Sequence, residues 1–167
     1  APQTSEDGIA DVALGLGKWV VEGFNSVRFC PSYPKHLLQF FSAKDTIKTA
    51  QQDFFVLNLS SERVISADTK PDVFIDRVGI ENAEADGTLF TVGSTYSPEN
   101  DAVYDGLSRP GQRIVTMAPI LKHKVFPLPD ILNLLLSMGV WGMGTQIEIE
   151  FAVNLNTGKG NPAEFAM

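Results

Sequence analysis

The sequence predicts an α+β domain in which short strands outnumber helices. Runs of β-branched and aromatic residues, bounded by Gly, Pro, Asn and Asp, recur along most of the 167 residues. Only two or three stretches carry helical signals, and the clearest covers residues 127–139. Because strands dominate and helices are few, the α+β class is favoured.

The first half of the chain begins with an apolar strand that enters a Gly-x-Gly turn at Gly15 and Gly17, followed by a β-branched segment up to Gly23. Glycine suits positions that need a positive φ or a close approach of the backbone. The turn is read either as a tight connection between core elements or as a backbone cradle beside a nucleotide. It is not a P-loop, because no G-x-x-x-x-G-K-[ST] is present.

The next elements follow from caps and apolar runs. An extended apolar run covers residues 37–41, and Asp45 is expected to cap a short helix over residues 46–52. A buried strand is expected at residues 54–59. Residues 72–76 form a short strand or helical turn in this interpretation.

Later elements are bounded by loop-forming residues and by proline. Strands are expected at residues 89–93 and 111–118, with a loop after the first of them. Pro127 opens the best helix of the chain, which is expected to stop at Gly139. A final pair of strands is expected around residues 146–153 and from residue 164 onward.

Composition sets limits on function. The chain is 44% hydrophobic and 20% charged, which is typical of a globular protein. Its net charge of −7 argues against a nucleic-acid-binding surface. A phosphate-rich ligand would need metal ions or a local basic cluster to offset that charge.

Length and cysteine content predict one domain in a reducing compartment. Residues 1–167 suit a single domain, and one cysteine, Cys30, cannot form an internal disulfide, so a cytoplasmic location is expected. No apolar stretch is long enough to span a membrane, and the N-terminus does not read as a secretory signal. Both ends look cut, so we expect the chain to be a fragment of a larger multidomain protein.

The most informative stretch for function is Gln-Ile-Glu-Ile-Glu-Phe-Ala-Val at residues 146–153. In a strand, Glu148 and Glu150 lie on one face, while Ile149 and Phe151 lie on the other. Two carboxylates about 7 Å apart suit one or two Mg²⁺ ions that also bind nucleotide phosphates. The alternative is an ordinary half-exposed strand with a solvated acidic face.

Three stretches together resemble the ATP-binding domain of the phosphoenolpyruvate synthase and pyruvate, phosphate dikinase family. Gly15-Leu16-Gly17-Lys18 with the following Val-Val-Glu-Gly is similar to the family's G-L-G-E-x-V-V-x-G, which borders the nucleotide. The strand with Glu148 and Glu150 resembles the family's D-I-E-W or D-M-E-F, which supplies metal-binding carboxylates. The C-terminal residues resemble the start of the strand that follows it.

The resemblance implies an ATP-grasp fold, of which this chain is the C-terminal subdomain: a mostly antiparallel sheet with two or three helices packed against one face. It implies ATP and Mg²⁺ as cofactors, with Gly15, Leu16, Gly17 and Lys18 at the nucleotide. Glu148 and Glu150 are then the metal ligands. One departure from the family is Lys18, which stands where a Glu is usual and cannot accept a hydrogen bond from a ribose hydroxyl.

The resemblance further implies an ATP-dependent dikinase-type phosphotransferase that phosphorylates a histidine on a separate domain, which then delivers the phosphoryl group to pyruvate. No catalytic residue is expected in this chain, which alone should be inactive, and His36 and His123 are read as structural or surface residues. The basic run from Lys122 to Lys124 is read as a solvated loop. The alternatives are a non-catalytic nucleotide- or ligand-sensing module on the same fold, and an unrelated α+β interaction domain. Neither a nucleic-acid nor a membrane partner is expected, and a homodimer is left open.

Overall fold

The computed structural model describes residues 7–60, 71–155 and 160–167. It confirms the α+β class. In order along the chain, the elements are β1 (Ala10–Val12), α1 (Lys18–Val21), β2 (Val27–Phe29), η2 (Leu38–Phe40), α2 (Ala43–Thr49), β3 (Asp53–Leu57), η3 (Pro71–Phe74), β4 (Ile75–Gly79), α3 (Ile80–Ala85), η4 (Thr88–Thr91), β5 (Gly93–Ser97), β6 (Ala102–Asp105), β7 (Gln112–Val115), α4 (Ala118–Leu121), α5 (Leu128–Met143), β8 (Ala152–Asn154) and β9 (Glu164–Ala166).

The strands form several small antiparallel sheets instead of one large sheet. The described strands pair as β1–β2, β3–β4, β6–β5–β7 and β8–β9, and each pairing is antiparallel. A single bridge between Gln51 and Val115 connects the start of β3 to the end of β7. The expected mostly antiparallel character is therefore confirmed, whereas helices stacked on one face of one sheet are not observed in the described part of the chain.

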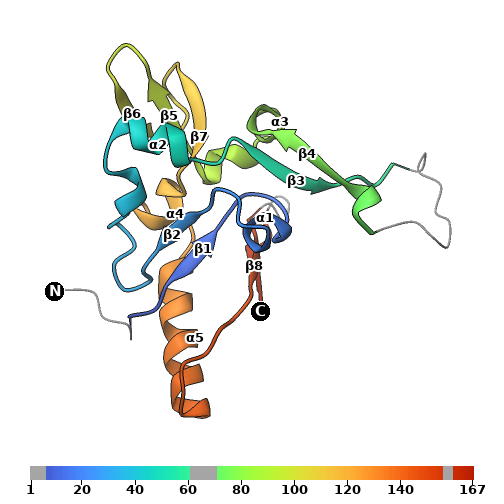
Figure 1. The fold of residues 1–167 in the computed structure, drawn as a ribbon, viewed down its shortest axis with the longest axis vertical. Helices are drawn as coiled ribbons and strands as arrows, with labels where there is room; N and C mark the ends of the chain where they lie inside the picture. The colour runs from blue at the N-terminus through green and yellow to red at the C-terminus, as the bar shows by residue number, and fades with distance from the viewer. Residues whose placement is uncertain (1–6, 61–70, 156–159) are drawn as a thin grey trace.

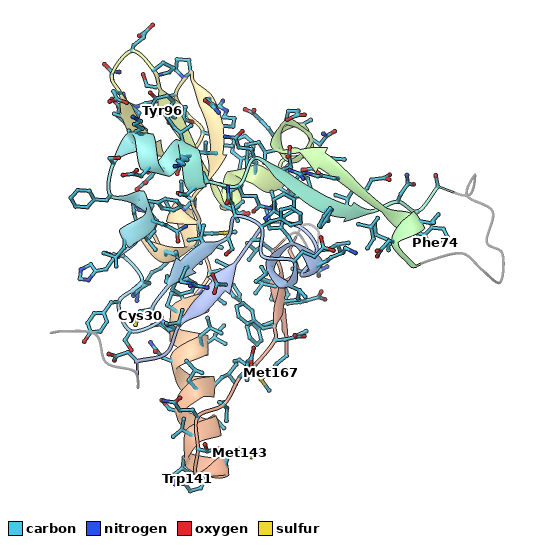
Figure 2. All side chains as sticks on the ribbon, in the orientation of Figure 1. Cys30, Phe74, Tyr96, Trp141, Met143 and Met167 are labelled. Atoms are coloured by element: carbon cyan, nitrogen blue, oxygen red, sulfur yellow. The ribbon has the colours of Figure 1, made fainter. Side chains whose placement is uncertain are left out.

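Figure 1 shows how these parts are arranged: the β3–β4 ribbon reaches out to one side, and α5 projects away from the three-stranded sheet. The β8–β9 hairpin lies near α1. Figure 2 places Phe74 at the far end of the β3–β4 ribbon. Strands of three to five residues are too short to form a broad sheet, so each small sheet buries its apolar side against a shared core.

The core lies where β1, β2, β7, α4 and the first half of α5 meet. Its most buried large side chains include Leu89, Ile114, Leu121 and Leu132. Only the first half of α5 enters this core, because its buried residues are Leu128, Pro129 and Leu132. Among the described residues, no helix has both the length and the apolar character needed to cross a bilayer.

The cap of α2 differs from the expectation. The helix begins at Ala43, and its N-cap is Ser42 instead of Asp45. The Ser42 hydroxyl accepts a hydrogen bond from the Asp45 backbone N–H at 3.1 Å and donates one to the Asp45 carboxylate at 2.6 Å. Asp45 therefore lies at the third helical position, where its N–H makes the serine half of a capping box and its carboxylate binds the Ser42 hydroxyl.

The expected strand at residues 89–93 is instead the short 3-10 helix η4, and β5 begins only at Gly93. Leu89 and Val92 are both buried and lie three residues apart, which suits one turn of a helix. A short apolar run can be read as strand or helix from periodicity alone. The 3-10 helix at residues 38–40 replaces an expected extended run in the same way.

The helix α5 continues one turn past its expected end at Gly139. It stops at Met143, and Gly144 follows in the left-handed conformation with φ of 67°. A Cβ at position 139 would collide with the side chain of Ile147. Gly139 therefore admits the returning chain against the helix, and the helix-ending glycine is Gly144.

Candidate functional site

A cavity of about 520 Å³ is lined by the glycine turn and by the residues from Phe151 onward, but not by Lys18, Glu148 or Glu150. Its volume lies within the range of ligand pockets in proteins. The loop from β1 to α1 forms one wall, β8 and its flanking residues form another, and the turn between α3 and η4 closes a third side. The residues that line it are Asp11, Val12, Ala13, Leu14, Gly15, Leu16, Gly17, Val20, Asp86, Gly87, Thr88, Thr91, Val92, Met117, Ile120, Leu128, Phe151, Ala152, Val153, Asn154 and Leu155.

Gly15 is fixed by its backbone and by β3. Its φ of 92° lies in the region that favours glycine. A Cβ at this position would come within 2.6 Å of the Phe55 carbonyl oxygen. The next residue, Leu16, donates its N–H to that same oxygen at 3.1 Å. The turn is therefore held directly against β3.

A buried glutamine completes this attachment. The Gln51 amide accepts a hydrogen bond from the Leu14 N–H at 2.8 Å and donates one to the Leu14 carbonyl oxygen at 2.9 Å. It also donates to the Asp53 carbonyl oxygen at 2.9 Å. Gln51 is almost fully buried. This residue fixes the entry to the turn, and no local signal in the sequence identified it.

Gly17 differs from Gly15 because nothing in the described fold requires a glycine there. Its backbone is in the ordinary right-handed helical region with φ of −55°, and a Cβ would meet no atom within 4 Å. Within the described residues, the N–H groups of Gly15 and Gly17 donate no hydrogen bond. The cavity wall at this turn therefore includes glycine backbone whose N–H groups have no partner among the described residues.

Gly23, in contrast, has a structural role. The segment after the turn forms the single helical turn α1, and Gly23 follows it in the left-handed conformation with φ of 76°. Its N–H donates to the Val20 carbonyl oxygen at 3.0 Å, and the Phe24 N–H donates to that of Trp19 at 3.2 Å. This is the usual way in which a glycine ends a helix.

Lys18 forms ion pairs and does not line the cavity. Its amine lies 2.8 Å from the Asp72 carboxylate and 3.2 Å from that of Glu22. The hydrogen bond to Asp72, and then that to Glu22, raise the pKa of the Lys18 amine above its ordinary value. The side chain thus connects α1 to η3, the short helix that leads into β4.

Glu148 and Glu150 are both exposed, whereas Ile149 and Phe151 are half-buried and pack against the core. The expected alternation is therefore confirmed. The expected sheet face is not, because within the described residues β8 starts only at Ala152 and the chain before it is extended without a paired strand. Its partner β9 pairs only with residues 152–154. The cavity wall begins at Phe151, so the Glu148 and Glu150 carboxylates lie outside it, on the opposite side of the chain from the Phe151 ring.

The residues present fit a magnesium ion only in part. Among the described residues, no three His, Cys, Asp or Glu side chains are grouped closely enough to hold a metal. Two exposed carboxylates on one side of an extended segment supply hard oxygen ligands. Mg²⁺ is commonly bound in proteins by one or two carboxylates together with waters and substrate phosphates. Two carboxylates alone would leave the remaining positions of such an ion to waters or to a phosphate-bearing ligand.

The turn between α3 and η4 is a part of the cavity that was not predicted from the sequence. Gly87 has φ of 84°, and the Asp86 carboxylate accepts hydrogen bonds from the Thr88 N–H at 2.9 Å and the Thr88 hydroxyl at 2.7 Å. The Asp-Gly pair is a turn signal that could have located this turn, though not its position at the cavity.

The histidines and the basic run are engaged elsewhere. The His123 ring lies 3.1 Å from the Asp105 carboxylate, and the Lys122 amine donates to the same carboxylate at 2.9 Å. Partial burial raises the pKa of Asp105, but the hydrogen bonds from Lys122 and His123 outweigh it, so the pKa lies below its ordinary value. His36 stacks on Tyr33. These contacts agree with structural or surface roles.

In comparisons with known proteins, no family model, no curated protein and no solved structure matches this chain.

Proposed function

We propose that this chain is the ATP- and Mg²⁺-binding part of a phosphotransferase similar to phosphoenolpyruvate synthase. In this proposal ATP phosphorylates a histidine on a separate domain, and that domain passes the phosphoryl group to pyruvate. The observation that supports it is the cavity itself. The glycine turn at residues 15–17 and the segment that follows Glu148 and Glu150 are more than 130 residues apart in the sequence, yet both line one cavity.

The nucleoside is best accommodated at the glycine turn. The cavity has a largely apolar lining, which suits the flat face of a base, and the bare backbone at Gly17 permits close approach. Because Gly17 has no structural requirement for glycine, a ligand that would clash with a Cβ is the best reason for its presence. Gln51 would hold the turn in place without contacting the ligand. Gly15 would contribute only its backbone to the binding site.

The phosphates would extend toward residues 148–150, which we call the acidic segment. Glu148 and Glu150 would hold Mg²⁺, which when bound offsets the negative charge of the phosphate oxygens. The described residues of the cavity wall include no Lys or Arg, and they include the two carboxylates of Asp11 and Asp86. Binding of a triphosphate therefore depends on the metal and on basic groups from outside this chain. We expect weak binding and no catalysis by the chain alone.

One observation favours a second candidate, the non-catalytic sensing module. Lys18 is paired with Asp72 and Glu22, so in this arrangement its charge is not available to a phosphate. A ligand without a triphosphate, such as a nucleoside, would then suit the cavity better. The two candidates differ in whether Mg²⁺ is required for binding.

The experiment that tests the main proposal is calorimetric titration with ATP, with and without Mg²⁺, compared with adenosine. The phosphotransferase proposal predicts that Mg²⁺ strengthens ATP binding and that Glu150→Gln removes this gain. The exposed Glu99, in the loop between β5 and β6, supplies the matched control Glu99→Gln. If adenosine binds as well as ATP and Mg²⁺ has no effect, the sensing module is the better account.

In a longer protein that carries the phosphohistidine domain, Glu150→Gln should abolish ATP-dependent phosphorylation of that histidine without unfolding the protein. The Gln side chain is nearly the same size as Glu, and an exposed position tolerates it. Wild-type phosphorylation in this variant would show that the Glu150 carboxylate is not a metal ligand.

A further inference from the structure

The second half of α5 carries an apolar stripe on its outer side. Leu134, Met138 and Trp141 lie at helical spacings of four and three residues, so they share one face. They are 60%, 58% and 90% exposed. Figure 2 shows Trp141 and Met143 at the free end of the helix, away from the rest of the molecule. A fully exposed tryptophan on an uncovered helix face is unusual for a monomer.

Much of the opposite side of α5 is already covered. The returning chain covers one side, where Ile147 packs against Gly139. Leu128 and Leu132, one to two turns earlier, are buried in the core. Val140 and Met143 are also exposed, but they lie on other sides of the helix. Leu134, Met138 and Trp141 are therefore the three large apolar side chains that align on one uncovered face in the described part of the chain. We call this face the α5 stripe.

Charge indicates what covers the α5 stripe. Residues 131–147 contain no Lys, Arg, Asp or Glu, although the whole chain has a net charge of −7. Two copies of an acidic protein repel each other over most of their surface, but an uncharged patch can meet its own copy without like-charge contacts. The absence of basic residues also makes an anionic membrane a poor partner for this segment.

Geometry sets how two such helices would pair. In Figure 1 the body of the molecule lies at the N-terminal end of α5, and the C-terminal end is free. A parallel pair would bring the two bodies to the same end, where they compete for space, whereas an antiparallel pair places them at opposite ends. With a two-fold axis between residues 137 and 138, Leu134 of one copy faces Trp141 of the other.

We propose that the α5 stripe is the contact between two copies of this chain, which form an antiparallel two-fold dimer through Leu134, Met138 and Trp141. Such a contact is isologous, as in most homodimers. This inference is independent of the proposed function, because the stripe residues do not line the cavity.

The expected strength follows from the area available. The three side chains of the stripe offer at most on the order of 500 Å² per copy, judged from the area that large apolar side chains bury. A standard interface uses about 800 Å² per partner. The dimer should therefore be weak, with half of the molecules dimeric at a concentration of roughly 10–100 μM.

The test is sedimentation velocity over a concentration series from about 1 to 500 μM, a span that brackets the expected dissociation constant. The wild-type chain should shift from monomer to dimer. The double variant Leu134→Gln/Trp141→Gln should weaken association at least about tenfold, because it removes the apolar contact without changing charge or helix propensity. The matched control Phe41→Gln, at an equally exposed aromatic residue outside α5, should dimerise like the wild type.

Cysteine cross-linking tests the orientation. Cys30 is buried, so an introduced thiol can be followed on its own. Ser137→Cys should cross-link readily between copies, because it lies at the proposed axis. Gly142→Cys lies about as far from the centre of the stripe as Ser137, on its other side, and a Cβ there meets no atom within 4 Å. It should not cross-link, because antiparallel pairing puts the two thiols about 14 Å apart along the helix, whereas a parallel pair would bring them level.

Several results would overturn the proposal. These are a monomer at every concentration, a dimer that the double variant leaves intact, and rapid cross-linking of Gly142→Cys. Binding of the monomer to neutral phosphatidylcholine vesicles through Trp141 would assign the stripe to a lipid surface instead. Thermal unfolding monitored by circular dichroism shows whether each variant is folded, so a loss of dimer is not mistaken for unfolding.

Discussion

The side chain of Gln51 forms two hydrogen bonds with the backbone of Leu14, accepting from its N–H at 2.8 Å and donating to its carbonyl oxygen at 2.9 Å. This pairing mimics an antiparallel strand contact with a single side chain. It fixes the residue that directly precedes the glycine turn. The position of that turn relative to β3 therefore depends on this buried amide together with the hydrogen bond from the Leu16 N–H to the Phe55 carbonyl oxygen.

We predict that Gln51→Leu destabilises the fold by about 1–3 kcal/mol, because it leaves the part-buried N–H and C=O groups of Leu14 without their side-chain partner. Urea denaturation measures this loss. The neighbour Gln52 is exposed, and its side chain makes only a long hydrogen bond of 3.4 Å to the Ile47 carbonyl oxygen. Gln52→Leu should change stability by less than about 0.5 kcal/mol. Equal effects of the two substitutions would contradict the anchoring role.

The two glycines of the turn should respond differently to alanine. Gly15→Ala places a Cβ against the Phe55 carbonyl oxygen at a positive φ, so we expect a loss of about 2 kcal/mol or more. Gly17→Ala meets open space at an ordinary φ, so stability should change by less than about 0.5 kcal/mol. Thermal unfolding of the two variants side by side checks both values. A destabilised Gly17→Ala would mean that this glycine has a structural role after all.

The glycines of α5 give a second matched pair. Gly139→Ala would force Ile147 away from the helix, and we expect it to cost about 1–3 kcal/mol. Gly142→Ala meets no atom within 4 Å and should stabilise the helix by about 0.5–1 kcal/mol. Chemical denaturation followed by helical circular dichroism measures both. If Gly139→Ala is tolerated as well as Gly142→Ala, the packing of Ile147 on the helix is not as described.

The cluster of Asp105, Lys122 and His123 should make a small, pH-dependent contribution to stability. The pKa of folded Asp105 lies below its ordinary value of 3.8, so its stabilising contribution is present above that value. It is lost as the pH falls through the folded pKa. At pH 7, Asp105→Asn should lower stability by about 0.5–1 kcal/mol, which is typical of a partly exposed ion pair.

The check on this prediction is a set of unfolding measurements between pH 7 and pH 3 for both proteins. The difference in unfolding free energy between wild type and Asp105→Asn should shrink as the pH falls below about 4. It should also shrink in high salt. A difference that stays constant down to low pH would show that the loss comes from packing and not from charge.

Local signals predicted those elements whose sequence pattern has a single physical meaning. The strand around Phe54, the strand around Ile114 and the start of α5 after Pro127 are all observed. Each has a long apolar pattern or a proline at a helix start, and neither is ambiguous. The short run around Leu89 failed because its apolar spacing fits both a strand and a helical turn.

The parts of the site that depend on distant contacts could not be predicted from sequence. Gln51 lies 37 residues from Leu14, and a buried glutamine has no local pattern that indicates which backbone it will bind. Asp105 likewise meets His123 across 18 residues. The acidic segment is a different case: the exposure of Glu148 and Glu150 was predicted from period two, but the pairing of that segment depends on a second strand.

The most direct test of the central claim, that the cavity between the glycine turn and β8 is a nucleotide site, is a titration followed by nitrogen–proton NMR. Mg²⁺ and ATP are added to the labelled chain at millimolar concentration, since weak binding is expected. We predict that the backbone signals of Gly15, Leu16, Gly17, Val153 and Asn154 shift together. Gly17→Val should fold normally and show greatly reduced shifts. No shift at these residues, or shifts confined to another surface, would contradict the proposal.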